Sequence, residues 1–307
     1  MDEQARLGLA LDASGIGIYS LDLNTGAISA DERYLAMLGY TVNEITPTLD
    51  WLRGALHPQE AELVNHSMGQ FISGERDRFR GEYRMRHRGG HWVWVEDRAE
   101  IVERDRCGQP LLIIGVHIDV SQRKRAEQRL AYQAEHDQLT HLLNRHSFLY
   151  ALKRVHAESR RTQRPYCIAM LDLDLFKAIN DNYGHFTGDR VLSRFAKLLR
   201  RSLREADWAA RWGGEEFVVL MPNTTADQAE RSMERLRERL AAACFGVVER
   251  PIRVTVSVGI AESGVADRGH DEIIERADAA LYAAKHLGRD RVCSASAREM
   301  IQAAALH

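Results

Sequence analysis

The stretch Arg211-Trp212-Gly213-Gly214-Glu215-Glu216-Phe217 decides how the chain is interpreted, because it is followed directly by the apolar residues Val218 to Met221. The apolar run predicts a buried strand. Paired glycines in front of a strand predict a tight hairpin, since only glycine enters the positive-φ region freely. The two carboxylates at its tip would repel each other by roughly 4 kcal/mol at ~4 Å, which favours a divalent cation nearby. An ordinary solvated turn with acidic flanks is the alternative.

Length and composition limit the classes of protein that need to be considered. The chain has 307 residues, which predicts two domains, and a formal net charge of −2, which gives no support for nucleic-acid or membrane binding. No apolar run is long enough for a membrane span, and the first residues do not resemble a signal peptide. The cysteines show no CxxC spacing and predict reduced thiols in a soluble, cytoplasmic protein; they are Cys107, Cys167, Cys244 and Cys293.

The first half of the chain shows the alternation expected of strands. Apolar and small residues alternate from Ile16 to Leu23, and further strands are predicted at Phe79–Arg86, His91–Ile101 and Leu111–Ile118. Short helical stretches lie between them, near residues 32–38 and 60–72. An antiparallel sheet of about five strands with few short helices is an α+β pattern typical of sensory modules.

This half resembles a PAS domain from about Leu7 to Ser121, most clearly in Tyr83–Arg86, Gly89–Trp94 and Gly115–Ser121. The resemblance implies a sensory role with haem, flavin, a small metabolite or only a partner chain as the ligand, and the sequence does not choose among them. Photochemical flavin binding is disfavoured, because the reactive-cysteine motif of light-sensing relatives is missing. Cys107 lies in a predicted loop instead. Histidines that are candidate ligands are His57, His66, His87 and His91.

Residues 121–136 predict a helical linker. The segment is charged, lacks proline and glycine, and carries Ala126, Leu130 and Ala134 at four-residue steps. Such a helix can pair with its twin in a dimer or stand alone in solvent, and the sequence leaves both open.

The second half predicts a split βαβ, ferredoxin-like domain with its helices on one side of the sheet. Residues 137–145 break the linker helix, a long helix follows to about Arg161, and the strand Tyr166–Leu171 runs into Asp172-Leu173-Asp174. Further helices are predicted from Gly188, at 226–243 and at 271–287, with a strand at 254–260.

Carboxylates at two strand ends carry the predicted chemistry. Asp172 ends one strand and Glu215 lies in the hairpin that joins the next two, so neighbouring strands bring them to one edge of the sheet. Together they can hold Mg²⁺, as in polymerase-like enzymes in which the metal activates a 3′-hydroxyl and neutralises phosphate charge. Asp174 is either a second ligand or solvated, and Asp172 is favoured.

From about Ala134 to Ser294 the chain is similar to the GGDEF family of diguanylate cyclases. The matching segments are Asp137–Arg145, Asp172–Asp181, Gly184-His185 with Gly188-Asp189, Gly213–Phe217 and Ala277–Lys285. The resemblance implies a polymerase-palm-like fold in which two such domains, each with one GTP, form cyclic di-GMP and two pyrophosphates as a homodimer.

The resemblance also implies residue roles. Asp172, the main-chain carbonyl of Leu173 and Glu215 would hold Mg²⁺. Glu215 is the usual base, although Glu216 or water can take the proton, because a metal-bound carboxylate is a poor base. Asn180 and Asp189 would bind guanine, with a carboxylate accepting from its N1–H and 2-amino group. The remaining substrate contacts would be His185 (or else a loop-packing histidine), Gly213 and Gly214, and the cations Lys177, Lys285 and Arg289.

A regulatory site is implied at Arg204-Glu205-Ala206-Asp207, which matches the family's RxxD product-inhibition site; an ordinary surface salt bridge is the alternative. The expected domains are 1–120 (PAS), 121–136 (linker), 137–295 (cyclase) and 296–307 (tail). A catalytically silent switch that binds GTP or cyclic di-GMP is the second functional hypothesis. A different nucleotidyl cyclase is the third, and it is disfavoured by Asn180 and Asp189.

Overall fold

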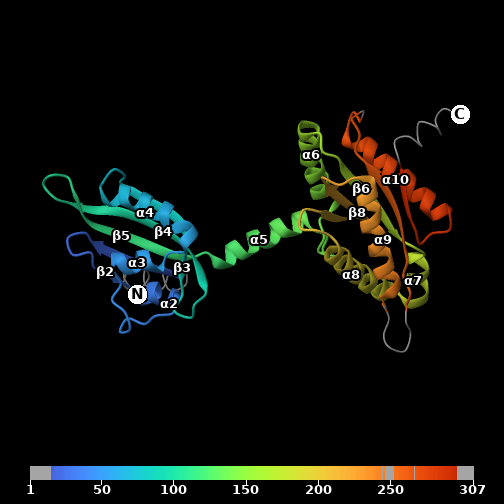
Figure 1. The fold of residues 1–307 in the computed structure, drawn as a ribbon. Helices are drawn as coiled ribbons and strands as arrows, with labels where there is room; N and C mark the ends of the chain where they lie inside the picture. Colours follow the sequence, from blue (N-terminus) through green and yellow to red (C-terminus); the bar gives the residue numbers. More distant parts are fainter. Residues whose placement is uncertain (1–14, 244, 246–251, 266, 296–307) are drawn as a thin grey trace. The chain divides into compact units, whose positions relative to one another are not determined.

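A computed structural model describes residues 15–243, 245, 252–265 and 267–295. The predictions for the first 14 residues, for Cys244 and for the tail 296–307 lie outside these ranges. The contacts between residues divide the chain into two units, one ending at Arg129 and the other beginning at Leu130 (Figure 1). Among the described residues, no helix combines the length and the apolar character that crossing a membrane requires.

The N-terminal unit contains an antiparallel sheet covered by helices on one face. Within the described residues the sheet has five strands in the order β2-β1-β5-β4-β3, as expected from the alternating sequence. The elements are β1 (Ile16–Asp22), β2 (Ile28–Ala30), α2 (Glu32–Met37), α3 (Leu49–Ala55), α4 (Pro58–Ile72), β3 (Arg78–Arg86), β4 (Trp92–Arg104) and β5 (Pro110–Asp119).

The core of this unit contains a buried polar cluster. The hydroxyl groups of Tyr19 and Tyr83 donate to the two carboxylate oxygens of Asp97, at 2.9 and 2.7 Å. Nε2 of the buried His117 lies 3.4 Å from the same carboxylate. Burial and the charge of Asp97 raise the pKa of both tyrosines, which therefore stay protonated and keep donating.

The histidines singled out from the sequence do not lie in this core. His57 accepts from the N–H of Gln59 at the start of α4, and His87 stacks on His91 at 4.1 Å between ring centroids. His66 is exposed on α4. A cavity of about 10 Å³ lies among apolar side chains next to Tyr19.

The predicted linker helix is observed as α5 (Ser121–Glu135). Leu130 on this helix is exposed and packs on neither core. An exposed Leu130 agrees with both the paired and the solvated helix expected from the sequence.

The C-terminal unit alternates helices and strands and begins within α5. Asn144 accepts from the N–H of Ser147 and starts α6, and Thr225 forms a capping box with Gln228 that starts α9. The elements are α6 (Arg145–Thr162), β6 (Tyr166–Leu173), α7 (Phe176–Tyr183), α8 (His185–Ser202), β7 (Trp208–Gly213), β8 (Glu216–Pro222), α9 (Ala226–Ala242), β9 (Val256–Glu262), α10 (His270–His286) and β10 (Val292–Ala295).

The sheet of this unit follows the predicted ferredoxin-like plan. In the described part of the chain it has five strands in the order β10-β9-β6-β8-β7, and β9, β6, β8 and β7 form the split βαβ order. Neighbouring strands are antiparallel except for β10 and β9. The register pairs Asp172 with Glu216, so the end of β6 and the start of β8 lie side by side.

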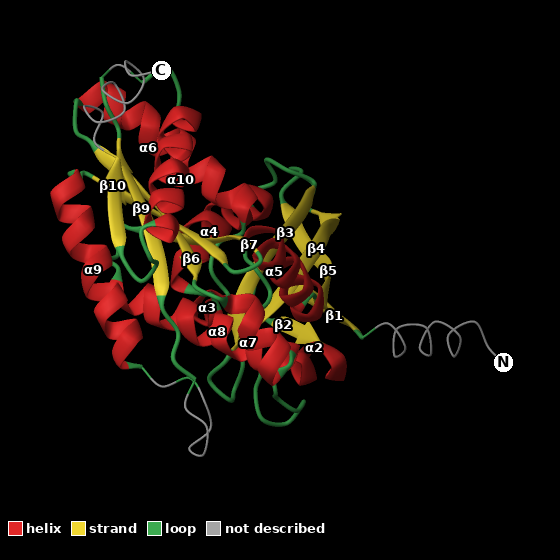
Figure 2. Cartoon of the chain, turned by 90° about the vertical axis from the view of Figure 1, so that its right-hand side faces the viewer, coloured by secondary structure: helices red, strands yellow, loops and turns green. Residues whose placement is uncertain are grey.

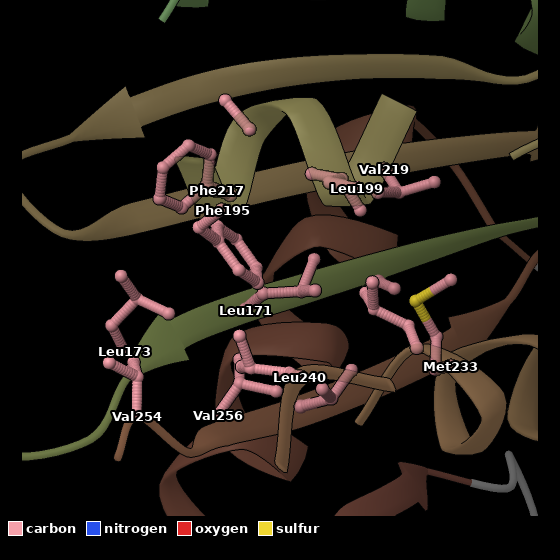
Figure 3. Packing of buried hydrophobic residues seen from close by; sticks show 14 of the residues in the cluster. Leu171, Leu173, Phe195, Leu199, Phe217, Val219, Met233, Leu240, Val254 and Val256 are labelled. Carbon is pink, nitrogen blue, oxygen red and sulfur yellow. The ribbon is translucent and has the colours of Figure 1, made fainter. Parts of the chain in front are cut away.

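The prediction that helices cover one side of this sheet is wrong. Residues of α8 and α9, such as Phe195 and Met233, pack on one face, where Phe195 meets Phe217 at 4.8 Å between ring centroids (Figure 3). Residues of α6 and α10, such as Phe148 and Leu281, pack with the side chains of the other face. Helices on both faces bury all eight residues of β6. Figure 2 shows the chain turned by 90° from the view of Figure 1, with β6, β7, β9 and β10 and the helices of this unit labelled.

Candidate active site

The sheet edge at the end of β6 brings the predicted metal ligands together. The N–H of Leu173 donates to the main-chain oxygen of Glu215 at 3.3 Å. The signature turn, defined as residues 213–216, joins β7 to β8, and Gly214 has a φ of 52°, as predicted for the tight hairpin. A Cβ built on Gly213 or Gly214 would meet nothing within 4 Å, so this side of the turn is open to a ligand.

Negative charge is concentrated at this edge. Burial raises the pKa of Asp172, and the charges of Glu215 and Asp174 add to the effect, while Lys285 lowers it. Burial and the charge of Asp172 likewise raise the pKa of Glu216. The ammonium group of Lys285 lies 2.6 Å from Asp172. The edge therefore attracts positive charge, and Lys285, predicted to contact the triphosphate, contacts a predicted metal ligand here.

The donor set fits Mg²⁺ bound together with a phosphate ligand. Asp172, Glu215 and the carbonyl of Leu173 offer hard oxygen atoms, and Mg²⁺ binds through one or two carboxylates plus substrate phosphates rather than through a complete protein cage. Accordingly, the described residues contain no group of three or more His, Cys, Asp or Glu side chains arranged for a metal.

A helix N-terminus follows the end of β6. Helix α7 starts at Phe176 without a side-chain cap, so its first N–H groups face outward with the positive end of the helix dipole. Lys177 lies in this first turn and is exposed. Such a terminus binds anions, and phosphates in particular.

The predicted guanine contacts meet where α7 packs against α8. A Cβ built on Gly188 would lie 1.9 Å from Oδ1 of Asn180, so Asn180 directly covers the residue before Asp189. Asp189 and His185 are exposed in the first turns of α8. The fold thus brings Asn180 and Asp189, which are nine positions apart in the sequence, to one place.

Asp174 is buried, so the alternative of a solvated carboxylate is wrong, and its role as a second metal ligand stays a prediction. Its buried carboxylate accepts from Thr255 at 2.7 Å, from Ser257 at 2.6 Å and from the N–H of Asp290 at 3.1 Å. Asp174 therefore holds the turn that presents Arg289, whose φ of 61° is left-handed.

One guanidinium connects the turn that follows α5 to the signature turn. Arg211 donates from Nε to the carbonyl of Gly214 at 2.9 Å and lies 3.2 Å from Asp137. Burial alone would raise the pKa of Asp137, but hydrogen bonds from Thr140 and the charge of Arg211 outweigh it and hold the pKa below its ordinary value. Leu143 also pairs with β7, through Leu143 N–H to Ala209 and Arg211 N–H to Leu143.

The motif patterns contained Asp137, Arg211 and Asp174 but gave Asp137 and Arg211 no role. Asp137 and Arg211 have opposite charges and lie at the edges of two motifs. Their contact could not be predicted from this alone, because it depends on how residue 143 pairs with β7.

The predicted inhibitory segment forms a turn beside a pocket. The N–H of Arg204 donates to Asp207 at 3.0 Å, and burial raises the pKa of Asp207. No ion pair joins the two side chains within the described residues, so the alternative of a surface salt bridge is not observed. The pocket beside them has a volume of about 340 Å³.

Comparisons with known proteins identify a family for each unit. Residues 134–291 match the family described as diguanylate cyclase, GGDEF domain, and residues 27–117 match the PAS fold. Diguanylate cyclase DgcM of Escherichia coli K12 is 39% identical over 188 residues, which are 61% of this chain and 45% of that protein. Diguanylate cyclase DgcP of Pseudomonas aeruginosa is 44% identical over 156 residues, which are 51% of this chain and 23% of that protein.

Among solved structures, the coiled coil and GGDEF domain of DgcB from Caulobacter crescentus, in complex with c-di-GMP, superposes with a TM-score of 0.54. It is 35% identical in sequence, and the match covers 57% of this chain and 93% of that one. The chain spans less than half the length of these two curated relatives.

Proposed function

Because the chain belongs to the family of GGDEF-domain diguanylate cyclases, we propose that it condenses two molecules of GTP into cyclic di-GMP and two pyrophosphates. The observation that carries the proposal is the sheet edge at Asp172 and the signature turn, which adjoins both an uncapped helix N-terminus and the pair Asn180 and Asp189.

The proposed chemistry assigns a task to each group. Asp172, Glu215 and the carbonyl of Leu173 would hold Mg²⁺, which supplies Lewis acidity to the phosphates when bound. The N–H groups of α7, with Lys177, Lys285 and Arg289, would orient the triphosphate and compensate its charge.

Asn180 and Asp189 would fix the guanine, and His185 would support this contact. The 3′-hydroxyl of one GTP then attacks the α-phosphate of the other, its proton passes to Glu215, Glu216 or water, and pyrophosphate leaves.

The product is symmetric, so two copies of the chain each contribute one bound GTP. We therefore propose a homodimer, with α5 as its pairing helix and the exposed Leu130 on the contact face. The N-terminal unit would act as the PAS sensor over residues 1–120, ahead of a linker at 121–136, a cyclase domain at 137–295 and a tail at 296–307.

Product analysis tests the proposal. We expect the full-length protein, stripped of bound nucleotide, to convert GTP with Mg²⁺ into cyclic di-GMP, and we expect EDTA to stop the reaction. GTP binding without turnover by a stripped, dimeric preparation would instead favour the silent switch.

We further propose that the Arg204 to Asp207 segment binds product and inhibits the enzyme. Replacing Arg204 by alanine removes a planar cation suited to phosphate and guanine, so we expect at least about tenfold weaker inhibition by added cyclic di-GMP, measured against the variant's own uninhibited rate. Arg201→Ala is the matched control, because Arg201 lies nearby in the last turn of α8 but does not line the pocket. Unchanged inhibition in Arg204→Ala would contradict the proposal.

A further inference from the structure

The pocket beside Arg204 has a second wall that no motif assigns. This wall comes from the turn that follows α5, and the opposite wall comes from the end of α8 and the start of β7. The polar and aromatic residues that line the pocket are His136, His141, Arg200, Arg204, Glu205, Asp207 and Trp208.

His141 occupies a backbone conformation that favours glycine. Its φ is 59°, in the left-handed region that other side chains enter only at a cost. Its side chain is exposed, and within the described part of the chain its imidazole makes no hydrogen bond. A glycine would form this turn without the cost, so the turn itself does not need the imidazole, which is available to a ligand in the pocket.

His136 presents an aromatic face and a free acceptor. Its ring stacks on Tyr132 at 4.0 Å with an interplanar angle of 6°, and its Nδ1 lies 3.1 Å from the carbonyl of Tyr132. A carbonyl can only accept, so Nδ1 carries the proton, and in the neutral ring Nε2 is then an acceptor. Guanine offers both a face for stacking and donors at N1 and the 2-amino group.

The opposite wall offers cations. The guanidinium groups of Arg200 and Arg204 make no ion pair with another described residue, and Arg204 hydrogen-bonds to Asp207 through its main-chain N–H and carbonyl. Two planar, unpaired guanidiniums next to imidazoles suit a ligand that combines phosphate charge with aromatic bases.

We propose that His136 and His141 are part of the product site, so that cyclic di-GMP held by Arg204 also contacts the turn that ends α5. This inference rests on the proposed function, because it takes the Arg204 to Asp207 segment as the product site. Bound product would then bridge the turn at residues 136–141 and the end of α8. Because this turn directly follows α5, product binding would also restrain the end of the linker helix.

The variant His141→Gly tests this directly, because glycine suits the left-handed turn and the fold keeps its stability. We expect the dissociation constant of cyclic di-GMP, measured by calorimetry on the stripped full-length protein, to rise about tenfold through loss of a charge-assisted contact. The thermal midpoint should stay level or rise.

The matched control is Gln163→Gly. Gln163 also has a left-handed φ, of 57°, but it ends α6 and does not line the pocket. Its replacement should leave the dissociation constant unchanged, and an equal loss of affinity in both variants would overturn the proposal.

The comparison with Arg204→Ala distinguishes a failure of the inhibitory site from a failure of the histidine wall, defined as His136 and His141. If His141→Gly binds product as the wild type does while Arg204→Ala does not, the histidine wall is refuted and the inhibitory site stands. If both variants bind as the wild type does, the inhibitory site falls, and the histidine wall falls with it.

Discussion

Glu215→Ala is expected to lower the rate of cyclic di-GMP formation at least about 1000-fold, which corresponds to ~4 kcal/mol of lost transition-state stabilisation. The substitution removes one of the two carboxylates that would hold Mg²⁺ and the residue that the family resemblance assigns as the base. The main chain of the turn should persist, because its hydrogen bond to Leu173 uses the carbonyl of residue 215 and not its side chain. The measurement is the initial rate of product formation from GTP at saturating Mg²⁺.

Glu238→Gln is the control for this variant. Glu238 is an exposed carboxylate on α9, so its removal should leave the rate unchanged. A Glu215→Ala protein that still turned over at more than a tenth of the wild-type rate would contradict the role assigned to the signature turn.

Gly259→Ala is expected to give the largest loss of stability. Gly259 lies on β9 where α10 approaches the sheet, and an added Cβ would meet the main-chain N of Leu281 at 2.0 Å and the carbonyl oxygen of Ala277 at 2.2 Å. Main-chain atoms of a helix cannot rotate away, so α10 has to move as a whole. We expect a destabilisation of roughly 3 kcal/mol or more, and a thermal midpoint lower by about 10 °C.

Gly264→Ala serves as the comparison, because an added Cβ at Gly264 meets only the Asp267 carboxylate at 3.7 Å, an ordinary contact. Its midpoint should match the wild type. An equally small change for Gly259→Ala, measured by thermal and urea unfolding, would mean that α10 lies farther from the sheet. Because α10 carries Lys285 to Asp172, we expect the Gly259 variant also to lose activity.

The sequence predicted those parts of the fold that depend on local chemistry. A tight hairpin needs a positive φ, which predicted the turn at Gly214. The apolar run that follows it predicted the strand β8. The meeting of Asp172 with the signature turn was predictable as well, since a split βαβ order makes β6 and β8 neighbours.

Features that depend on packing were missed, although some left a signal. The run of β6 is continuously apolar rather than alternating, which indicates burial on both faces and should have argued against a sheet covered on one side only. In the same way, strict alternation along β5 places His117 on the inner face with Ile113 and Gly115, whereas the histidines chosen as ligand candidates lie in loops, at strand ends or on a helix.

The role of Asp174 left no such signal. Its partners Thr255 and Ser257 lie about 80 positions further along the chain, and only the register of β6 with β9 brings them together.

The connection from Asp137 through Arg211 to Gly214 has a consequence for how such chains can be recombined. The contact that ties the turn after α5 to the signature turn lies wholly within the C-terminal unit. A chimera that joins a foreign helical module upstream should therefore preserve residues 134–144 and keep the helical phase across the splice. If the C-terminal unit is the proposed cyclase, modules of unrelated ancestry would then regulate it through the same contact of Arg211.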